Sequence, residues 1–140
     1  MSVMSASCAN NPLAMLVALA DQLRLRFEDS AAAVGLTPAQ AEILTRIEDD
    51  TRMGDLAQKK LCDPSSVTTM VRRLERDGVV IRAVDPHDAR ARIVRLTAKG
   101  RRVRQQFLHL VGSGDSIIDA LSDEQRASLA GLFAGRHVVP

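Results

Sequence analysis

The sequence predicts a mostly α-helical protein that carries one small β-hairpin. Three observations predict this fold class. Apolar residues recur at helical spacing along most of the chain, and residues 37–40 (TPAQ) and 122–125 (SDEQ) match capping boxes. Residues 79–97 are rich in β-branched side chains on both sides of an Asp-Pro turn. The core must be largely aliphatic, because the chain has no Tyr or Trp and only three Phe residues.

The first predicted helix begins at Pro12, since proline is suited to the first turn of a helix. Its apolar stripe consists of Leu13, Leu16, Val17, Ala20, Leu23 and Phe27. Gly35 is predicted to end it. A second helix begins in the capping box at 37–40 and runs through Ile47. The acidic residues 48–50 predict a loop, because anions at a helix C-terminus oppose the helix dipole.

A short helix is predicted over 54–61 and a second over 65–77, with Asp63 as its cap and Pro64 at its first position. The apolar residues of the second helix are Val67, Met70, Val71 and Leu74. Gly78 is predicted to close it. Strands are expected over 79–84 and 92–97, joined by a turn at 85–88 and a loop that carries Arg90. Residues 54–97 therefore predict a helix-turn-helix followed by a wing.

A long helix is expected from Thr97 through Leu121, with a bend near Gly112 and Gly114, and a last helix follows the capping box at 122–125. The long helices at both ends of the chain lack internal neighbours for all of their apolar surface. A second subunit, intertwined through both termini, is the expected cover.

Charge is unevenly distributed along the chain. Residues 59–104 hold 13 of the 19 Lys and Arg residues but 5 of the 17 Asp and Glu residues, so this segment carries +8 and the remainder −6. Such a basic centre favours contact with a polyanion. The alternative is an ordinary solvated surface of mixed charge.

The candidate contact residues lie on the polar face of the second helix of the motif and on the wing. The helix presents Ser65, Ser66, Thr68, Thr69, Arg72 and Arg73 on the face opposite its apolar stripe. In the alternative interpretation these residues only cap and solvate the helix. If the polyanion is duplex DNA, Arg90 on the wing suits its narrow minor groove, and Arg92 lies beside it in the sequence. Asp88 either holds the Arg90 guanidinium or caps the turn.

The segment 56–100 resembles the core of the MarR family of regulators. The resemblance is carried by Leu56-Ala57, Cys62-Asp63-Pro64-Ser65, Val67-Thr68, Arg73-Leu74-Glu75, Gly78, Val80, Asp85-Pro86, Asp88, Arg90, Val94, Leu96-Thr97 and Gly100. It covers about a third of the chain.

The resemblance implies a homodimer with dimerisation helices in 1–36 and 98–140 around a winged helix-turn-helix DNA-binding domain in 37–97. It implies a pseudo-palindromic double-stranded DNA operator and repression that a small aromatic or anionic effector relieves. Recognition helices would enter major grooves through Ser65, Ser66, Thr68, Thr69 and Arg73, and wings would enter minor grooves through Arg90, oriented by Asp88. Arg72 departs from the family pattern and adds a phosphate contact.

The sequence gives little support for other functional classes. Two cysteines, Cys8 and Cys62, form no disulfide framework or metal-ligand spacing, which favours a reducing cytoplasm. Both are candidate redox residues, so a cysteine-sensing or effector-independent DNA-binding regulator is the alternative function. We expect no cofactor, no bound metal, no membrane span and no enzyme, since no phosphate loop, nucleophile elbow or long apolar run occurs.

Overall fold

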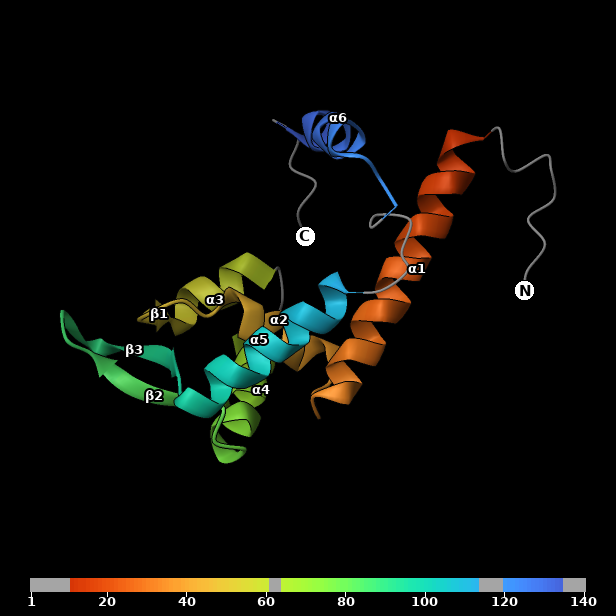
Figure 1. Cartoon of the computed structure of the whole chain (residues 1–140). Coiled ribbons are helices and arrows are strands. Elements are labelled where there is room, and N and C mark those ends of the chain that lie inside the picture. The colour runs from red at the N-terminus through yellow and green to blue at the C-terminus, as the bar shows by residue number, and fades with distance from the viewer. Residues whose placement is uncertain (1–10, 61–63, 114–119, 135–140) are drawn as a thin grey trace.

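The computed structural model describes residues 11–60, 64–113 and 120–134. In these ranges the helices are α1 (Pro12–Ala33), α2 (Pro38–Arg46), α3 (Met53–Lys60), α4 (Pro64–Arg76), α5 (Ala98–Gly112) and α6 (Asp123–Phe133), and the strands are β1 (Thr51–Arg52), β2 (Val80–Asp85) and β3 (Asp88–Leu96). The predicted fold class is confirmed: the protein is mostly helical, with a small wing of strands. Figure 1 shows the β2–β3 hairpin projecting at the end of the molecule opposite α1.

The predicted helix boundaries follow from local capping. Asn11 caps α1 by accepting a hydrogen bond of 3.0 Å from the Leu13 amide, and Gly35 ends the helix region with a φ of 74°. Both capping boxes form. In the first, the Gln40 amide donates to Thr37 Oγ1 at 3.2 Å and the Thr37 amide donates to Gln40 Oε1 at 2.9 Å. The second box joins the backbone and side chains of Ser122 and Gln125 in the same way.

The wing differs from the prediction in two respects. It is a three-stranded antiparallel sheet of order β1-β3-β2, because Thr51 and Arg52 pair with Val94 and Ile93 of β3. The second strand of the hairpin also begins earlier than expected, at Asp88. Asp85 pairs with Asp88, yet the preceding residue of β2 pairs with Arg92, so residues 89–91 form a bulge in β3. Arg90 therefore lies in a bulge of the strand and not in a connecting loop.

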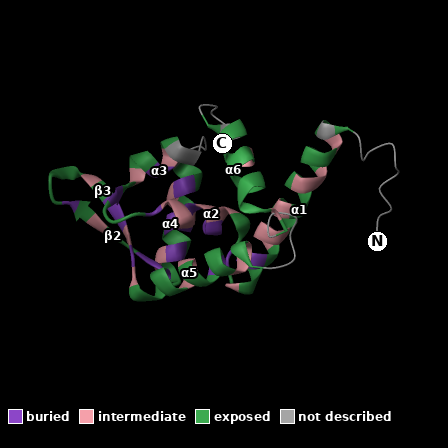
Figure 2. Ribbon diagram, turned by 45° about the horizontal axis from the view of Figure 1, so that its top comes forward, coloured by how far each residue is buried: buried purple, intermediate pink, exposed green. Residues whose placement is uncertain are grey.

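The core lies where α2, α4, the sheet and α5 meet, as the buried ribbon segments in Figure 2 show. The inward face of α4 is fully buried through Val67, Val71 and Leu74, as its spacing predicts. Phe107 of α5 is also buried, and its ring meets that of Phe27 of α1 edge to face with centroids 5.0 Å apart. This contact attaches the C-terminal half of α1 to the rest of the fold.

The predicted long helix after Thr97 is wrong in its length. Thr97 caps α5 as expected, with its Oγ1 accepting a bond of 3.0 Å from the Gly100 amide. The helix ends at Gly112, and the next residue, Ser113, has an extended backbone with ψ of 139°. Apolar periodicity alone would continue the helix past Gly112. The low helix propensity of glycine favours its end at this position. The apolar residues expected beyond this point, Ile117 and Ile118, lie outside the described residues.

Apolar side chains remain uncovered at the N-terminal half of α1. Leu13, Leu16 and Val17 are 67%, 52% and 54% exposed, although they belong to the same stripe as Phe27. Leu132 of α6 is 66% exposed. This surface is unusually apolar for a helix that faces water. Such a surface is expected to be covered by a second subunit. None of the helices in the described ranges combines the length and apolar character needed to cross a membrane.

Candidate nucleic-acid interface

The outer face of α4 gathers all the candidate residues predicted for that helix. The exposed members are Ser65, Ser66, Thr69, Arg72 and Arg73. Thr68 is half-buried at the side of the helix nearest the wing. A shallow hollow of about 390 Å³ lies over the first turns of this face. Short hydroxyls and two arginines thus form one accessible polar surface, which could approach a nucleic acid closely.

The wing candidates are exposed as well, and their contacts fix the bulge. The Arg90 amide donates to Asp88 Oδ1 at 3.0 Å, so Asp88 caps the backbone of the turn. Of the two roles considered for Asp88, the structure shows this one. Arg92 Nη1 donates to the carbonyls of Ala89 at 3.2 Å and Ala91 at 3.3 Å. These bonds hold the bulge, and Arg90 lines the hollow between the wing and the first turn of α3.

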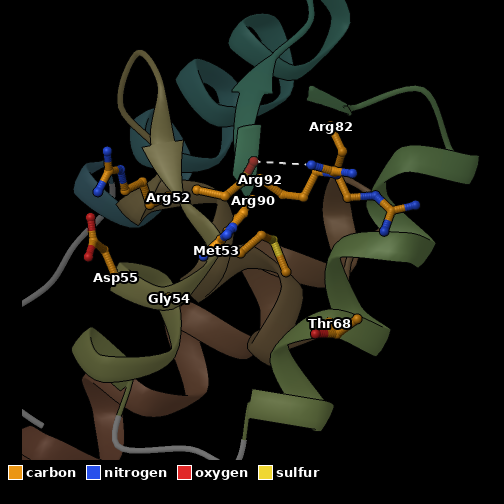
Figure 3. A pocket seen from close by; sticks show the side chains of 9 residues that line it. Arg52, Met53, Gly54, Asp55, Thr68, Arg82, Arg90 and Arg92 are labelled. Atoms are coloured by element: carbon orange, nitrogen blue, oxygen red, sulfur yellow. Dashed lines mark hydrogen bonds between the residues drawn. The ribbon is translucent and has the colours of Figure 1, made fainter. Parts of the chain in front are cut away.

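Four arginines line a groove between the wing and the helices, which we call the arginine groove. They are Arg52 of β1, Arg82 of β2 and Arg90 and Arg92 of β3. The groove has a volume of about 570 Å³, and the remaining walls come from the first turn of α3 and from Thr68 of α4. Figure 3 shows Arg82 and Thr68 on the α4 side of the groove, with Arg52 and Asp55 on the opposite side. Asp55 is the one acidic residue among the described lining residues.

Arg52 belongs to this site, although no pattern in the sequence marked it as a candidate contact residue. Its Nε donates to Asp85 Oδ2 at 2.7 Å, which ties β1 to the tip of the wing. Asp85 is buried, with 5% of its surface exposed, and also accepts a bond of 2.8 Å from the His87 amide. The His87 amide, followed by the Arg52 guanidinium, lowers the pKa of the Asp85 carboxyl. The two partners are 33 residues apart in the sequence, so only the fold reveals the pair.

Arg82 is also held in place by a carboxylate. Glu75 of α4 accepts from Arg82 Nε at 2.8 Å and from its Nη2 at 2.6 Å, and the Arg82 amide donates to the same carboxylate at 3.3 Å. The hydrogen bonds from the Arg82 side chain lower the pKa of Glu75. This pair joins α4 directly to the wing, so the two contact surfaces are fixed relative to each other.

A further ion pair supports the strand that carries Arg52. Asp50, at a φ of 59° in the turn before β1, contacts Arg95 of β3. The hydrogen bond from Arg95 lowers the pKa of Asp50, and Asp50 raises the pKa of Arg95.

Cys8 and Cys62 lie outside the described residues. In the described part of the chain, no three His, Cys, Asp or Glu side chains are placed to hold a metal ion.

Comparison with known sequences gives a consistent set of relatives. The model of the MarR family matches residues 36–91. YcgE, an uncharacterized HTH-type transcriptional regulator of Bacillus subtilis, is 35% identical over 113 residues, which are 76% of this chain and 71% of YcgE. The transcriptional activatory protein BadR of Rhodopseudomonas palustris is 32% identical over 100 residues, 68% of this chain and 57% of BadR. The similarity to YdgJ of B. subtilis, at 36% identity, covers 50% of this chain and 44% of that regulator. The chain thus matches about half the length of YdgJ and BadR.

Solved structures share the fold along nearly the whole chain. The apo form of MarR from E. coli has a TM-score of 0.72 at 21% identity, with 96% of this chain and 97% of MarR covered. The transcriptional repressor CouR, bound to a 23-mer DNA duplex, has a TM-score of 0.73 at 23% identity, with 96% and 97% covered. A mutant of E. coli MarR complexed with operator DNA has a TM-score of 0.70 at 24% identity, with 94% and 97% covered. At these identities the likeness is one of fold.

Proposed function

This chain belongs to the MarR family of transcriptional regulators, and we propose that it acts as a homodimer that binds double-stranded DNA sequence-specifically. The observation that carries this proposal is the exposed polar face of α4 beside the arginine groove. The face offers Ser65, Ser66, Thr69 and Arg73 at the surface, and four arginines line the groove beside it. Duplex DNA is the polyanion that accepts both base-edge and phosphate contacts from such a surface.

Each recognition surface is assigned a groove. The face of α4 enters the major groove, where Thr68 and Arg73 read base edges and Arg72 contacts phosphate. Arg90 and Arg92 on the wing enter the adjacent minor groove, and Asp88 shapes the turn from which Arg90 extends. The complex of CouR with a DNA duplex and that of the MarR mutant with operator DNA support this assignment by fold analogy.

The uncovered stripe on α1 supports the homodimer. Leu13, Leu16 and Val17 would be buried by a second copy of the chain, together with α6. A two-fold dimer places two α4 helices on one side of a duplex, so its operator is a pseudo-palindrome with half-sites one helical turn apart.

We propose repression as the outcome of binding, with release by a small aromatic or anionic effector between the dimerisation and DNA-binding regions. BadR is named as an activatory protein, so activation is the competing outcome. Phe27 and Phe107 pack on each other, and the ring of an effector would therefore meet mainly aliphatic side chains. A thermal-shift screen of small aromatic acids tests the effector, because a ligand that binds the folded state raises the melting temperature.

DNA binding is tested by fluorescence anisotropy on duplexes from the region upstream of the gene. Binding that weakens steeply with salt and retains a preference for one duplex supports the proposal, whereas no binding at low salt contradicts it. A reporter gene placed behind the bound duplex separates repression from activation. If peroxide releases the DNA and substitution of Cys8 and Cys62 by serine abolishes this effect, the redox alternative replaces the effector.

A further inference from the structure

We propose that Arg52 contacts a DNA phosphate, and that the arginine groove holds the backbone of one strand where it passes from α4 to the wing. The proposal rests on the proposed function and adds to it a contact outside both α4 and the hairpin. Arg52 lies on β1, the two-residue strand that pairs with the outer side of β3.

The Arg52 side chain is fixed and only partly used. Its Nε donates to Asp85, and among the described residues its two terminal amino groups have no hydrogen-bond partner. Half of the side chain is exposed, whereas Asp85 is buried and held by the His87 amide. A guanidinium anchored at Nε is held in one position at the wall of the groove, and its terminal amino groups remain available to an anion. Such preorganisation reduces the conformational entropy lost when an anion binds.

The other walls of the groove favour the same ligand. Arg92 donates to backbone carbonyls, and its charge is not paired with a carboxylate in the described part of the chain. The first turn of α3 contributes Met53 and Gly54, and no atom lies within 4 Å of the site where Gly54 would carry a Cβ. The backbone there is accessible, and the positive end of the helix dipole adds attraction for an anion.

The position of the groove identifies the anion as a DNA phosphate. Thr68 on one wall belongs to the major-groove surface, and Arg90 belongs to the minor-groove surface. The sugar-phosphate backbone separates these two grooves of a duplex, so a strand contacted by both must cross between them. A phosphodiester offers two charged oxygens, which match the paired amino groups of a guanidinium. Asp55 on the Arg52 side opposes this contact by charge repulsion.

The alternative is that Arg52 only holds the wing through Asp85. The salt dependence of binding distinguishes the two roles, because each neutralised phosphate contributes about 0.9 to the slope of log affinity against log salt. Arg52→Gln removes the charge, and Asp85→Asn weakens the wing contact while leaving the charge in place. We expect Arg52→Gln to weaken binding about tenfold and to reduce the slope by about 0.9. Asp85→Asn should keep the slope of the unmodified protein.

The measurement uses fluorescence anisotropy on a labelled duplex of about 30 base pairs, which spans two half-sites. Asp55→Asn is a second variant, and it should bind several times more tightly because it removes a repulsive charge beside the phosphate. An unchanged slope in Arg52→Gln, or unchanged affinity in Asp55→Asn, overturns the assignment of Arg52. If the unmodified protein binds no duplex, the proposed function itself fails, so the two failures are distinguishable.

Discussion

Gly100 of α5 lies so close to Val79 that a Cβ at Gly100 would be 2.0 Å from the Val79 carbonyl oxygen. That oxygen cannot move freely, because it also accepts a bond of 3.1 Å from the Thr97 amide. The contact sets α5 directly against the start of the wing. The contact explains why a glycine occurs in the first turn of α5, which Thr97 caps.

Gly100→Ala is therefore expected to destabilise the fold, since either α5 or the Val79 backbone must shift. Overpacking of this kind costs about 1–3 kcal/mol in free energy of unfolding. Urea denaturation measures the change. Gly112→Ala in the same helix is the control, because a Cβ there meets no atom within 4 Å. Equal stability of the two variants would show that the close contact is not maintained in solution.

Glu75→Gln is expected to loosen the junction between α4 and the wing. The side chains of Glu75 and Arg82 are each a third exposed, so solvent screening limits the loss near neutral pH to about 0.5–1 kcal/mol. The folded-state pKa of the Glu75 carboxyl lies below its ordinary value of 4.5. The stabilisation is therefore present above pH 4.5 and is lost as the pH falls through the lower folded-state value.

This pH dependence is measured by urea denaturation at neutral pH and at successive values below 4.5. The difference between the unmodified protein and Glu75→Gln should shrink as the pH falls. Glu48→Gln is the matched control, because the Glu48 side chain is exposed and has no hydrogen-bond partner in the ranges described. A difference that grows toward acid would contradict the ion-pair assignment.

Arg90→Ala is expected to weaken binding to many duplexes by a similar factor. Arg90 lies in the bulge of β3, and an arginine in a minor groove responds to groove width and charge more than to base identity. The salt slope should fall by about 0.9 for one lost phosphate contact. Anisotropy titrations at several salt concentrations measure this slope. A slope equal to that of the unmodified protein would place Arg90 outside the interface.

Substitutions on α4 should instead change sequence preference. Arg73→Ala is expected to cost roughly 1–3 kcal/mol at one or two base positions and little on other duplexes, as for the loss of a bidentate base contact. Thr68→Ala should act at a neighbouring position. Competition with duplexes carrying single base changes measures the preference. A uniform loss across all of them would assign Arg73 to phosphate.

Leu16→Asp is expected to weaken self-association, because Leu16 lies in the uncovered apolar stripe of α1 and a buried charge is costly. Sedimentation or light scattering across a concentration series measures the dimer. Gln22→Asp on the opposite side of the same helix is the control and should remain dimeric. Identical association of the two variants would mean that the stripe is not the interface.

Local rules predicted much of this molecule from its sequence. Prolines at the first helical position, the capping box at 37–40 and periodicity placed α1, α2 and α4, and Gly78, with a φ of 71°, follows α4 as predicted. The predicted cap Asp63 lies outside the described residues. The polar face of α4 follows from the same periodicity. β1 was missed because a strand of two residues carries no alternation that a pattern could reveal.

The arginine groove was missed for a different reason. Arg52 and Asp85 are joined only after β1 pairs with β3, and no local pattern encodes that pairing. The bulge at 89–91 likewise depends on the register of the whole hairpin. The end of α5 was misjudged because apolar periodicity continues past Gly112 in the sequence.

Selection of bound DNA from a pool of random duplexes tests most directly whether the outer face of α4 reads DNA. Recovery of an inverted repeat with half-sites one helical turn apart is the predicted result, and Arg73→Ala should lose the preference at a base within each half-site. Failure of the purified protein to enrich any duplex at low salt, or equal enrichment by the Arg73 variant at every position, would contradict it.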